Sequence, residues 1–340
     1  MRALQLIDER DIRLVQRDPP PPPGPGEVQM RVRLVGLNHI DVWGWRGMAF
    51  AKRKFPFTVT TEAMGEIAAV HADVTGFTVG QRVVPFGAIT CGLCRACRDG
   101  RDNLCEAVSG IRGFHIDGFA QELINHPARL IIRVPDGVAD RDAACAPVAY
   151  GTVEHMLFDN ARLETGETIL VHAGGSGIGT IAVRIAKSLG CTVITTVGSE
   201  EKAIKARALG ADHVINYRTE RFEGVVRKLT AKKGVDVVFE HVGADTWSGS
   251  LLSLRKGGRL VTCGATSGPS ASINLMQLFQ QQYRIFGSFG ASKRNIAAAM
   301  DRMATGVLPV IDTEYAMADF GAGLERLHQR DVFGKILVRL

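Results

Sequence analysis

The feature that most restricts the fold is a glycine-rich turn that lies directly between an apolar strand and an amphipathic helix. The turn reads GGSGIG (174–179), it follows TILVHA (168–173), and apolar residues then recur at helical spacing until Gly190. Glycine lets a backbone approach a pyrophosphate closely, and the first turn of a helix offers free N–H groups and the positive end of its dipole. The turn therefore indicates a dinucleotide site. Tight packing alone also selects glycine, and the second motif glycine is Ser176 here.

Units of strand and helix follow this turn. Further strands are predicted at 191–197, 212–215, 235–240, 258–263 and 283–289, alternating with helices near 200–209, 219–231 and 246–254. Apolar strands that alternate with helices are typical of a parallel sheet covered on both faces. Six such strands are the number that a dinucleotide-binding sheet requires. We therefore predict an α/β domain with a doubly wound, six-stranded parallel sheet that binds a dinucleotide at the turn.

The N-terminal part of the chain has a different pattern. Residues 1 to about 125 contain short alternating strands broken by Gly and Pro, such as 27–37 and 66–74, and this pattern predicts a β-rich, barrel-like domain. The C-terminal tail predicts a helix at 293–304, then a strand-like segment and a final KILVRL. We expect the tail to return to the first domain. The predicted domains are therefore 1–140 with 291–340, and 141–290 inserted between them.

The end of the second strand of the sheet indicates which dinucleotide binds. An NAD site usually carries an acid there, about 20 residues beyond the glycines, to bind the ribose 2′-hydroxyl. Here the strand ends in TVGS (196–199), and Lys202 follows one helical turn later. The hydroxyl of Ser199 and the ammonium of Lys202 suit a 2′-phosphate, so we predict NADP(H), with NAD(H) as the alternative. In the competing interpretation, Ser199 only caps the helix and Lys202 is a surface lysine.

Four of the seven cysteines lie within fifteen residues. Cys91, Cys94, Cys97 and Cys105 form the pattern C-x₂-C-x₂-C-x₇-C, which lets one loop place four thiolates around a metal. Four soft thiolate ligands leave no open position for water and indicate a structural Zn²⁺. An iron–sulfur cluster is the alternative, because similar spacings bind those clusters too. We predict a zinc lobe near 91–105.

Composition limits the partners of the chain. Its 340 residues carry a net charge of +6, and the 41 Lys and Arg residues are scattered among 35 Asp and Glu residues. This distribution does not favour nucleic acid. The N-terminal segment lacks an apolar core with a cleavage site, and no apolar run approaches about 18 residues, so we expect neither a signal peptide nor a membrane span. We expect a cytoplasmic protein that acts on a small molecule.

Several motifs in order resemble the medium-chain dehydrogenase/reductase superfamily over essentially the whole chain. They are PPGPGEVQMRVRLVGLN, FPFTVTTEAMGEI, VGQRVVPFG, the four-cysteine lobe, DGFAQEL, HAGGSGIG and GADHVINY. The resemblance implies a GroES-like catalytic domain and a Rossmann domain, with the active site in the cleft between them. It implies that Tyr217 lies beside the adenine. The cofactor contacts expected on this basis are Thr152, Gly174, Ser176, Gly177, Ile178, Ser199, Lys202, Tyr217, Val242, Gly264 and Ser288.

The resemblance also implies where a catalytic zinc would be bound. In the zinc-dependent alcohol dehydrogenases of the superfamily, the ligands are a Cys, a His in Gly-His-Glu and a later Cys or carboxylate. These positions fall on Asn38, Thr61 and near Val148, and only the motif glutamate, Glu62, is kept. One carboxylate does not hold zinc. The hydroxyl that relays the alcohol proton falls on Ile40. The segment GLNHIDVWGWRG (36–47) instead resembles the quinone oxidoreductase branch, which usually lacks the four-cysteine lobe.

These features predict hydride transfer from NADPH to a quinone or to the β-carbon of an α,β-unsaturated carbonyl compound. Negative charge on the carbonyl oxygen would be met by hydrogen-bond donors. The main candidates are Asn38, His39 and Thr61, with Thr60 and Arg46 behind them.

Other interpretations of the chain stay open. Asp41 and Glu62 are expected to be structural, bonded to backbone or to Arg46. The alternatives are an alcohol dehydrogenase, either without catalytic zinc or with a metal held by residues such as His39 and Glu62, and an NADPH-binding protein without turnover. We expect a homodimer, with a tetramer as the alternative.

Overall fold

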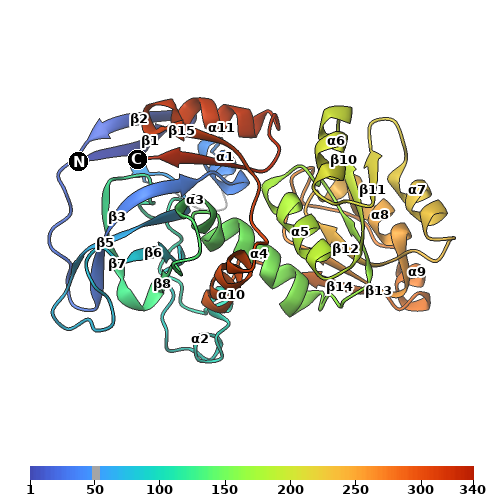
Figure 1. Cartoon of the computed structure of the whole chain (residues 1–340), viewed down its shortest axis with the longest axis horizontal. Helices are drawn as coiled ribbons and strands as arrows, with labels where there is room; N and C mark the ends of the chain where they lie inside the picture. Colours follow the sequence, from blue (N-terminus) through green and yellow to red (C-terminus); the bar gives the residue numbers. More distant parts are fainter. Residues whose placement is uncertain (48–53) are drawn as a thin grey trace. The chain divides into compact units, whose positions relative to one another are not determined.

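The computed structural model describes residues 1–47 and 54–340 and is drawn in Figure 1. The chain divides into two compact units. Unit 1 consists of Met1–Gly151 and Ala291–Leu340, and unit 2 consists of Thr152–Gly290. The C-terminal segment thus belongs to the same unit as the N-terminal one, and unit 2 is inserted in the sequence between them.

Unit 1 is rich in short strands. Its strands are β1 (Arg2–Asp8), β2 (Asp11–Gln16), β3 (Glu27–Gly36), β4 (Phe57–Thr58), β5 (Glu62–Val70), β6 (Arg82–Pro85), β7 (Leu123–Pro127), β8 (Ile131–Arg133), β15 (Ile311–Ala316) and β16 (Lys335–Arg339). Its helices are α1 (His39–Trp45), α2 (Arg95–Arg98), η1 (Asp102–Leu104), η2 (Ala128–Leu130), α3 (Asp140–Ala143), η3 (Ala146–Tyr150), α10 (Lys293–Ala304), η5 (Met317–Asp319) and α11 (Phe320–His328).

The sheets of unit 1 join the two ends of the chain. In the described residues, one sheet runs in the order β15-β16-β3-β5-β6-β8, with β7 also paired to β3, and a second runs β2-β1-β4. The last strand, β16, pairs antiparallel with β3, so that Leu337 lies opposite Gly36. Alternate residues of β3, Val28, Met30 and Val32, are buried in the core of the unit. This alternation is why the segment forms a strand with one buried face.

Unit 2, all of whose residues are described, alternates strands and helices. Its strands are β9 (Thr168–Val171), β10 (Thr192–Val197), β11 (His213–Asn216), β12 (Val235–Glu240), β13 (Leu254–Thr262) and β14 (Arg284–Gly287). Its helices are α4 (from Gly151 to Glu154), η4 (His155–Asn160), α5 (Gly177–Ser188), α6 (Glu200–Ala208), α7 (Phe222–Leu229), α8 (Ala244–Ser253) and α9 (Leu275–Gln280).

The sheet of unit 2 has six strands in the order β11-β10-β9-β12-β13-β14, and the strand pairs of this fully described unit are parallel. The chain moves outward from β9 to β11 and then restarts at β12 in the opposite direction. Right-handed crossovers therefore place α5 and α6 on one face and α8 on the other. This is the Rossmann arrangement, and the predicted fold class is confirmed.

Some elements differ from the sequence-based expectation. Helix α11 was not predicted, because its sequence FGAGLERLH contains two glycines that obscure helical periodicity. At one of them, Gly323, an added Cβ would lie 3.1 Å from the ring of Tyr315. Close packing therefore explains why a glycine stands at this position. Strand β5 begins at Glu62, earlier than predicted, because this charged residue is fully buried and has buried partners.

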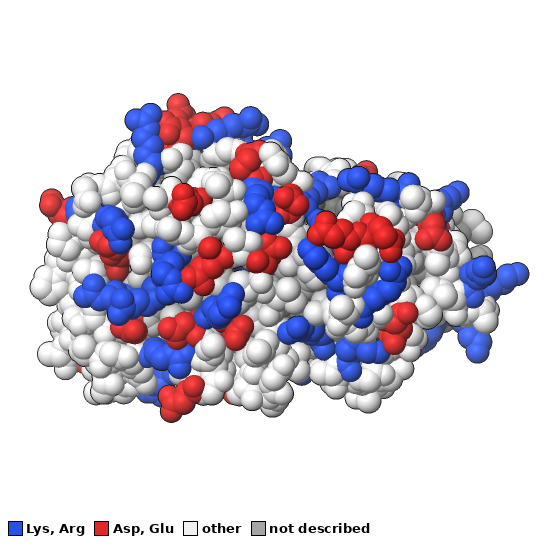
Figure 2. All heavy atoms as spheres, turned by 45° about the horizontal axis from the view of Figure 1, so that its top comes forward, with Lys and Arg blue, Asp and Glu red and all other residues white. Residues whose placement is uncertain are grey.

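The lengths of the helices and the distribution of surface charge can be compared with the predicted absence of membrane and nucleic-acid partners. No helix in residues 1–47 and 54–340 is both long and apolar enough to span a membrane. On the face drawn in Figure 2, basic and acidic side chains are interspersed.

Candidate functional site

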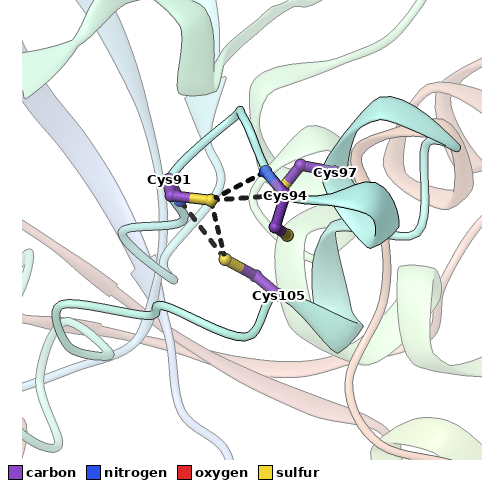
Figure 3. Close-up of side chains that lie close together, drawn as sticks. All are labelled: Cys91, Cys94, Cys97 and Cys105. Carbon is purple, nitrogen blue, oxygen red and sulfur yellow. Dashed lines mark hydrogen bonds between the residues drawn. The ribbon is translucent and has the colours of Figure 1, made fainter.

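The four predicted metal ligands lie together in a loop of unit 1. Their Sγ atoms all lie within 4.8 Å of one another, and in the described residues this is the group of His, Cys, Asp or Glu side chains that could hold a metal ion. Cys91 Sγ lies 4.0 Å from Cys97 Sγ and 3.5 Å from Cys105 Sγ. Zn–S bonds of about 2.3 Å in a tetrahedron place sulfur atoms about 3.8 Å apart. The geometry therefore fits one zinc ion held by four thiolates (Figure 3).

Backbone N–H groups of the loop point at the sulfur atoms. Cys94 and Leu93 donate to Cys91 Sγ at 3.3 and 3.4 Å, and Cys91 donates to Cys105 Sγ at 3.3 Å. The hydrogen bonds from Cys94 and Leu93 lower the pKa of Cys91 to about 6. Such donors stabilise thiolates, which are the form that binds metal. The tight turns of the loop thus prepare it for a cation.

The predicted cofactor residues lie in unit 2, mostly where its strands end. Gly174, Ser176, Gly177 and Ile178 follow β9, Ser199 and Lys202 follow β10, Tyr217 follows β11, Val242 follows β12, Gly264 follows β13, and Ser288 follows β14. The carboxyl ends of parallel strands share one edge of a sheet, so these residues gather at one edge, which we call the cofactor edge. Thr152 differs, since it lies in α4 before the first strand.

The glycine turn lets α5 pack closely on the sheet. A Cβ on Gly174 would lie 2.1 Å from Thr195 Oγ1, and one on Gly179 would lie 2.3 Å from the carbonyl oxygen of Ala173. Both glycines are therefore required for α5 to pack closely on the sheet. Ser176 caps α5 by accepting from the N–H of Gly179 at 2.9 Å. The N–H groups at the first helical positions have no intrahelical acceptor and remain available for an anion.

The end of β10 is covered by a tyrosine and capped by a serine. A Cβ on Gly198 would lie 2.5 Å from the hydroxyl of Tyr217, so this tyrosine packs directly over the strand end. Ser199 caps α6 by accepting from the N–H of Lys202 at 3.3 Å. This cap uses the oxygen of Ser199 as an acceptor and leaves its hydroxyl hydrogen able to donate. The structure is therefore compatible both with a 2′-phosphate site and with a simple helix cap.

The two acids that follow Ser199 are engaged on the helix surface. Glu200 pairs with Arg207 at 3.0 Å and Glu201 with Lys205 at 2.6 Å. Both carboxylates are more than two-thirds exposed.

A buried polar network lies beneath the cofactor edge and was not predicted from the sequence. His172, at the end of β9, contacts Thr196 Oγ1 at 3.2 Å through Nδ1 and Ser250 Oγ at 2.9 Å through Nε2. Ser250 donates to Glu240 at 2.7 Å, and Glu240 also accepts from the N–H of Val242 at 2.7 Å. Burial lowers the pKa of His172, so its ring is neutral and can donate to Ser250. The network ties together the ends of β9, β10 and β12.

In unit 1, the predicted residue Asn38 is part of a buried ion-pair network. Lys335 Nζ donates at 2.7 Å to the carbonyl oxygen of Leu37, to Asn38 Oδ1 and to Glu62 Oε2. Asn38 Nδ2 donates to Glu62 Oε2 at 2.9 Å. The side chains of Lys335 and Glu62 are 2% and 0% exposed. All three ammonium protons and the asparagine amide therefore have partners within the chain.

Glu62 also joins this network to the start of η3. Its Oε1 accepts from the N–H groups of Val148 and Ala149 at 2.7 and 2.8 Å. The expectation that Glu62 bonds to backbone is thus correct, but its cation partner is Lys335 rather than Arg46. Sequence reasoning missed Lys335 because a lysine in a terminal strand usually faces solvent. The sequence signal for its burial was its position at the start of the apolar run KILV (335–338).

The two other predicted catalytic residues differ in their surroundings. His39 is the first residue of α1, and its ring packs edge-on against Trp43 with centroids 5.5 Å apart. Thr61 directly precedes β5 and is 3% exposed, and its hydroxyl has no hydrogen-bond partner in the described chain. Asn38 and Thr61 lie next to the same residue, Glu62. The hydroxyl of Thr61 is thus buried and unpaired among the described residues, and it can bond only a ligand that reaches into this part of unit 1.

Comparison with known proteins gives the family. The model described as alcohol dehydrogenase GroES-like domain matches residues 24–136, and that described as zinc-binding dehydrogenase matches 177–305. The chain belongs to the medium-chain dehydrogenase/reductase superfamily and is an NAD(P)-dependent oxidoreductase.

Relatives within the superfamily include both reductases and alcohol dehydrogenases. The chain is 31% identical over 313 residues to acryloyl-coenzyme A reductase of Metallosphaera sedula, covering 92% of this chain and 91% of the relative. It is 35% identical over 258 residues to a quinone oxidoreductase of Pseudomonas aeruginosa, covering 75% and 70%. A solved structure of an NAD-dependent alcohol dehydrogenase matches over all of both chains, with a TM-score of 0.93 and 32% identity.

Proposed function

We propose that the protein uses NADPH to reduce a quinone or the β-carbon of an α,β-unsaturated carbonyl compound, without a catalytic zinc. The network around Glu62 carries this proposal. The positions at which alcohol dehydrogenases of the superfamily bind zinc fall on Asn38, Thr61 and Val148, and none of these side chains is a metal ligand of the kind zinc prefers. Asn38 is bonded to Lys335 and Glu62, and Val148 contributes a backbone N–H.

The chemistry of these residues favours reduction of an electron-poor acceptor. Bound NADPH supplies the hydride. Oxidation of a simple alcohol without a Lewis acid would lose several kcal/mol of transition-state stabilisation. Charge that develops on a carbonyl oxygen can instead be met by a hydrogen-bond donor. Thr61 is the best candidate because its hydroxyl has no partner in the described residues, and His39 is the second.

The relatives support this class of acceptor. One acts, by its name, on an acryloyl thioester and another on a quinone. The similarity to an alcohol dehydrogenase over the whole chain makes alcohol oxidation the second candidate.

The test is a screen of quinones, α,β-unsaturated carbonyl compounds and alcohols. Turnover is monitored through the absorbance of the nicotinamide. We expect oxidation of NADPH with a quinone or an enone, and no reduction of NADP⁺ by simple alcohols. The matched control is the zinc content of the same sample. Turnover of alcohols by protein holding two zinc ions per chain would contradict the proposal. Binding of NADPH without turnover of any acceptor would indicate a non-catalytic protein.

We also propose that NADPH is preferred over NADH and that Lys202 contributes to this preference. Replacing Lys202 by alanine is expected to lower kcat/KM for NADPH about 10-fold, which corresponds to about 1.4 kcal/mol, because a charge-assisted hydrogen bond to the 2′-phosphate is lost. The value for NADH should stay the same. Lys205→Ala, on the same helix and paired with Glu201, is the matched control. An equal loss with both cofactors would show that Lys202 does not read the phosphate.

A homodimer and a cytoplasmic location complete the proposal. Strand β14 is an edge strand of the sheet of unit 2. An unpaired edge strand can pair with the same strand of a second copy of the chain. Near it in sequence, Leu275, Met276, Phe279 and Phe289 are each more than 60% exposed. Four thiolates in a metal site suit a reducing compartment.

A further inference from the structure

Three buried polar atoms close to the proposed site have no partner within the described chain. They are Asp41 Oδ1, Thr60 Oγ1 and Thr61 Oγ1. Asp41 is 7% exposed, and the two threonines are 0% and 3% exposed. Each unpaired buried group costs about 1–3 kcal/mol. A fold accepts that cost where the group has to react or to bind a ligand.

The backbone at this place is also strained. Thr60 has φ 71°, a left-handed conformation that β-branched residues rarely adopt. Two glycines hold it there: a Cβ on Gly113 would lie 2.2 Å from the carbonyl oxygen of Thr60, and one on Gly118 would lie 2.4 Å from it. The same oxygen accepts from the N–H of Phe119 at 3.0 Å. Strain that is fixed by its surroundings in this way is typical of functional sites. Here it fixes the position of the next residue, Thr61.

Asp41 lies beside Thr61 and has an unusual environment. Its Oδ2 accepts from the N–H of Asn38 at 2.8 Å, and the N–H of Thr61 also acts on the carboxyl. Asp41 also lines a cavity of about 10 Å³ whose other walls are mostly apolar, among them Leu6 and Trp45. Burial raises the pKa of Asp41 to about 7, against the opposing effects of the Asn38 N–H and the Lys335 ammonium.

We propose that Asp41 is the proton source of the reduction and delivers its proton through the hydroxyl of Thr61. Asp41 Oδ1 and Thr61 Oγ1 are not hydrogen-bonded to each other in the structure, so the relay passes through one water between them. The inference rests on the proposed function. Hydride adds to the β-carbon of the substrate, a C–H bond forms, and the π electrons of the C=C bond move to the carbonyl oxygen. Thr61 then gives its hydroxyl proton to that oxygen and recovers a proton from Asp41, and the enol that forms tautomerises to the saturated carbonyl compound. The carboxylate that remains recovers a proton from solvent, so each turnover consumes one NADPH and one H⁺.

Other titratable groups face this site and must be distinguished from Asp41. Lys335 of β16 and Glu62 of β5 act directly on the carboxyl. From α11, His328 packs on Trp45 with ring centroids 5.7 Å apart, and Arg10 lies 5.8 Å from the same ring. His39 lies on α1 itself. A pH profile of the wild type alone is therefore insufficient, and the profile has to be compared with that of an Asp41 variant.

The kinetic test compares Asp41→Asn, Thr61→Val and Thr61→Ser with the wild type, using the acceptor found in the screen. We expect kcat of the wild type to fall as pH rises through about 7, because the protonated carboxyl is the active form. In D41N and T61V, kcat should drop about 100-fold or more, and D41N should lose the fall at high pH. T61S, which keeps the hydroxyl, should retain most of the activity. The Kd for NADPH should not change.

A readout that does not need turnover is the infrared difference spectrum of wild type minus D41N without cofactor. It should show a protonated carboxyl band that disappears around pH 7. Two results would overturn the proton-delivery role of Asp41 but not the proposed function. One is an Asp41 carboxyl that is already ionised at pH 5, and the other is a D41N variant with the kcat and pH profile of an active wild type. A wild type that reduces no acceptor would overturn the proposed function together with this role. Thermal unfolding of D41N controls for folding, since the neutral amide has nearly the shape of the protonated carboxyl.

Discussion

Replacing Lys335 by methionine is expected to destabilise unit 1 by about 3–5 kcal/mol, because it leaves the buried carboxylate of Glu62 without its cation. The ammonium makes three hydrogen bonds of 2.7 Å and is 2% exposed. The measurement is urea-induced unfolding followed by tryptophan fluorescence. In a Trp247→Phe background, the remaining tryptophans, Trp43 and Trp45, both lie in α1 and report on unit 1.

Two controls separate the buried pair from charge in general. Arg13→Met removes a pair with Asp11 of similar length, 2.6 Å, whose side chains are 64% and 36% exposed. It should change the stability little, because both charges are screened by solvent. The double variant K335M/E62Q removes both charges and should recover part of the loss, since no uncompensated carboxylate remains. Equal effects of K335M and Arg13→Met would contradict the structural importance of the buried pair.

Removal of metal from the cysteine loop is the second large effect expected. The purified protein should contain about one zinc per chain, and a strong chelator should open the loop. Zinc binding to four thiolates contributes about 10 kcal/mol or more in small domains, and the loop has few buried apolar residues of its own, with Ala96 the buried residue of α2. Trypsin should then cut after Arg95 and Arg101, which are 84% and 51% exposed.

Variants assign the metal to these cysteines. Cys105→Ser should lose zinc and be cut by trypsin without chelator, whereas Cys263→Ser, in unit 2, should keep one zinc per chain. Two zinc ions per chain would contradict the proposal that the chain lacks a catalytic zinc. Iron with sulfide and visible absorption in place of zinc would identify a cluster instead. The loop contacts α10 through the N–H of Lys293 and Asp102 at 3.4 Å. The rest of unit 1 should stay folded, because the residues of its hydrophobic core lie outside the loop.

The parts of the fold that sequence could predict are those with a strong repeat. Strands β9 to β14 and the helix at Lys293–Ala304 were visible because each has its own apolar period and its own glycine boundary. The cysteine group was visible because its ligands are adjacent in sequence. Helix α11 was missed because two glycines interrupt its pattern.

The parts that sequence could not predict depend on contacts between distant residues. Lys335 looks like a surface lysine until β16 places it against Glu62. The hydroxyls of Thr60 and Thr61 carry no sign in the sequence that they lack partners. The His172 network joins residues of three strand ends and one helix, and none of its members has a distinctive spacing. Polar groups inside a fold acquire their partners only from topology.

The partnership of Glu62 with Lys335 has a consequence for biosynthesis. The two residues are 273 positions apart. During translation, Glu62 therefore leaves the ribosome long before Lys335 has been synthesised. Between these two events, all of unit 2 (Thr152–Gly290) is synthesised. This segment contains all the strands of its own sheet. Bringing the chain ends together is a loop closure whose entropic cost grows only slowly with length. During translation, therefore, the inserted unit can be complete while the unit that begins the chain still waits for its final strand.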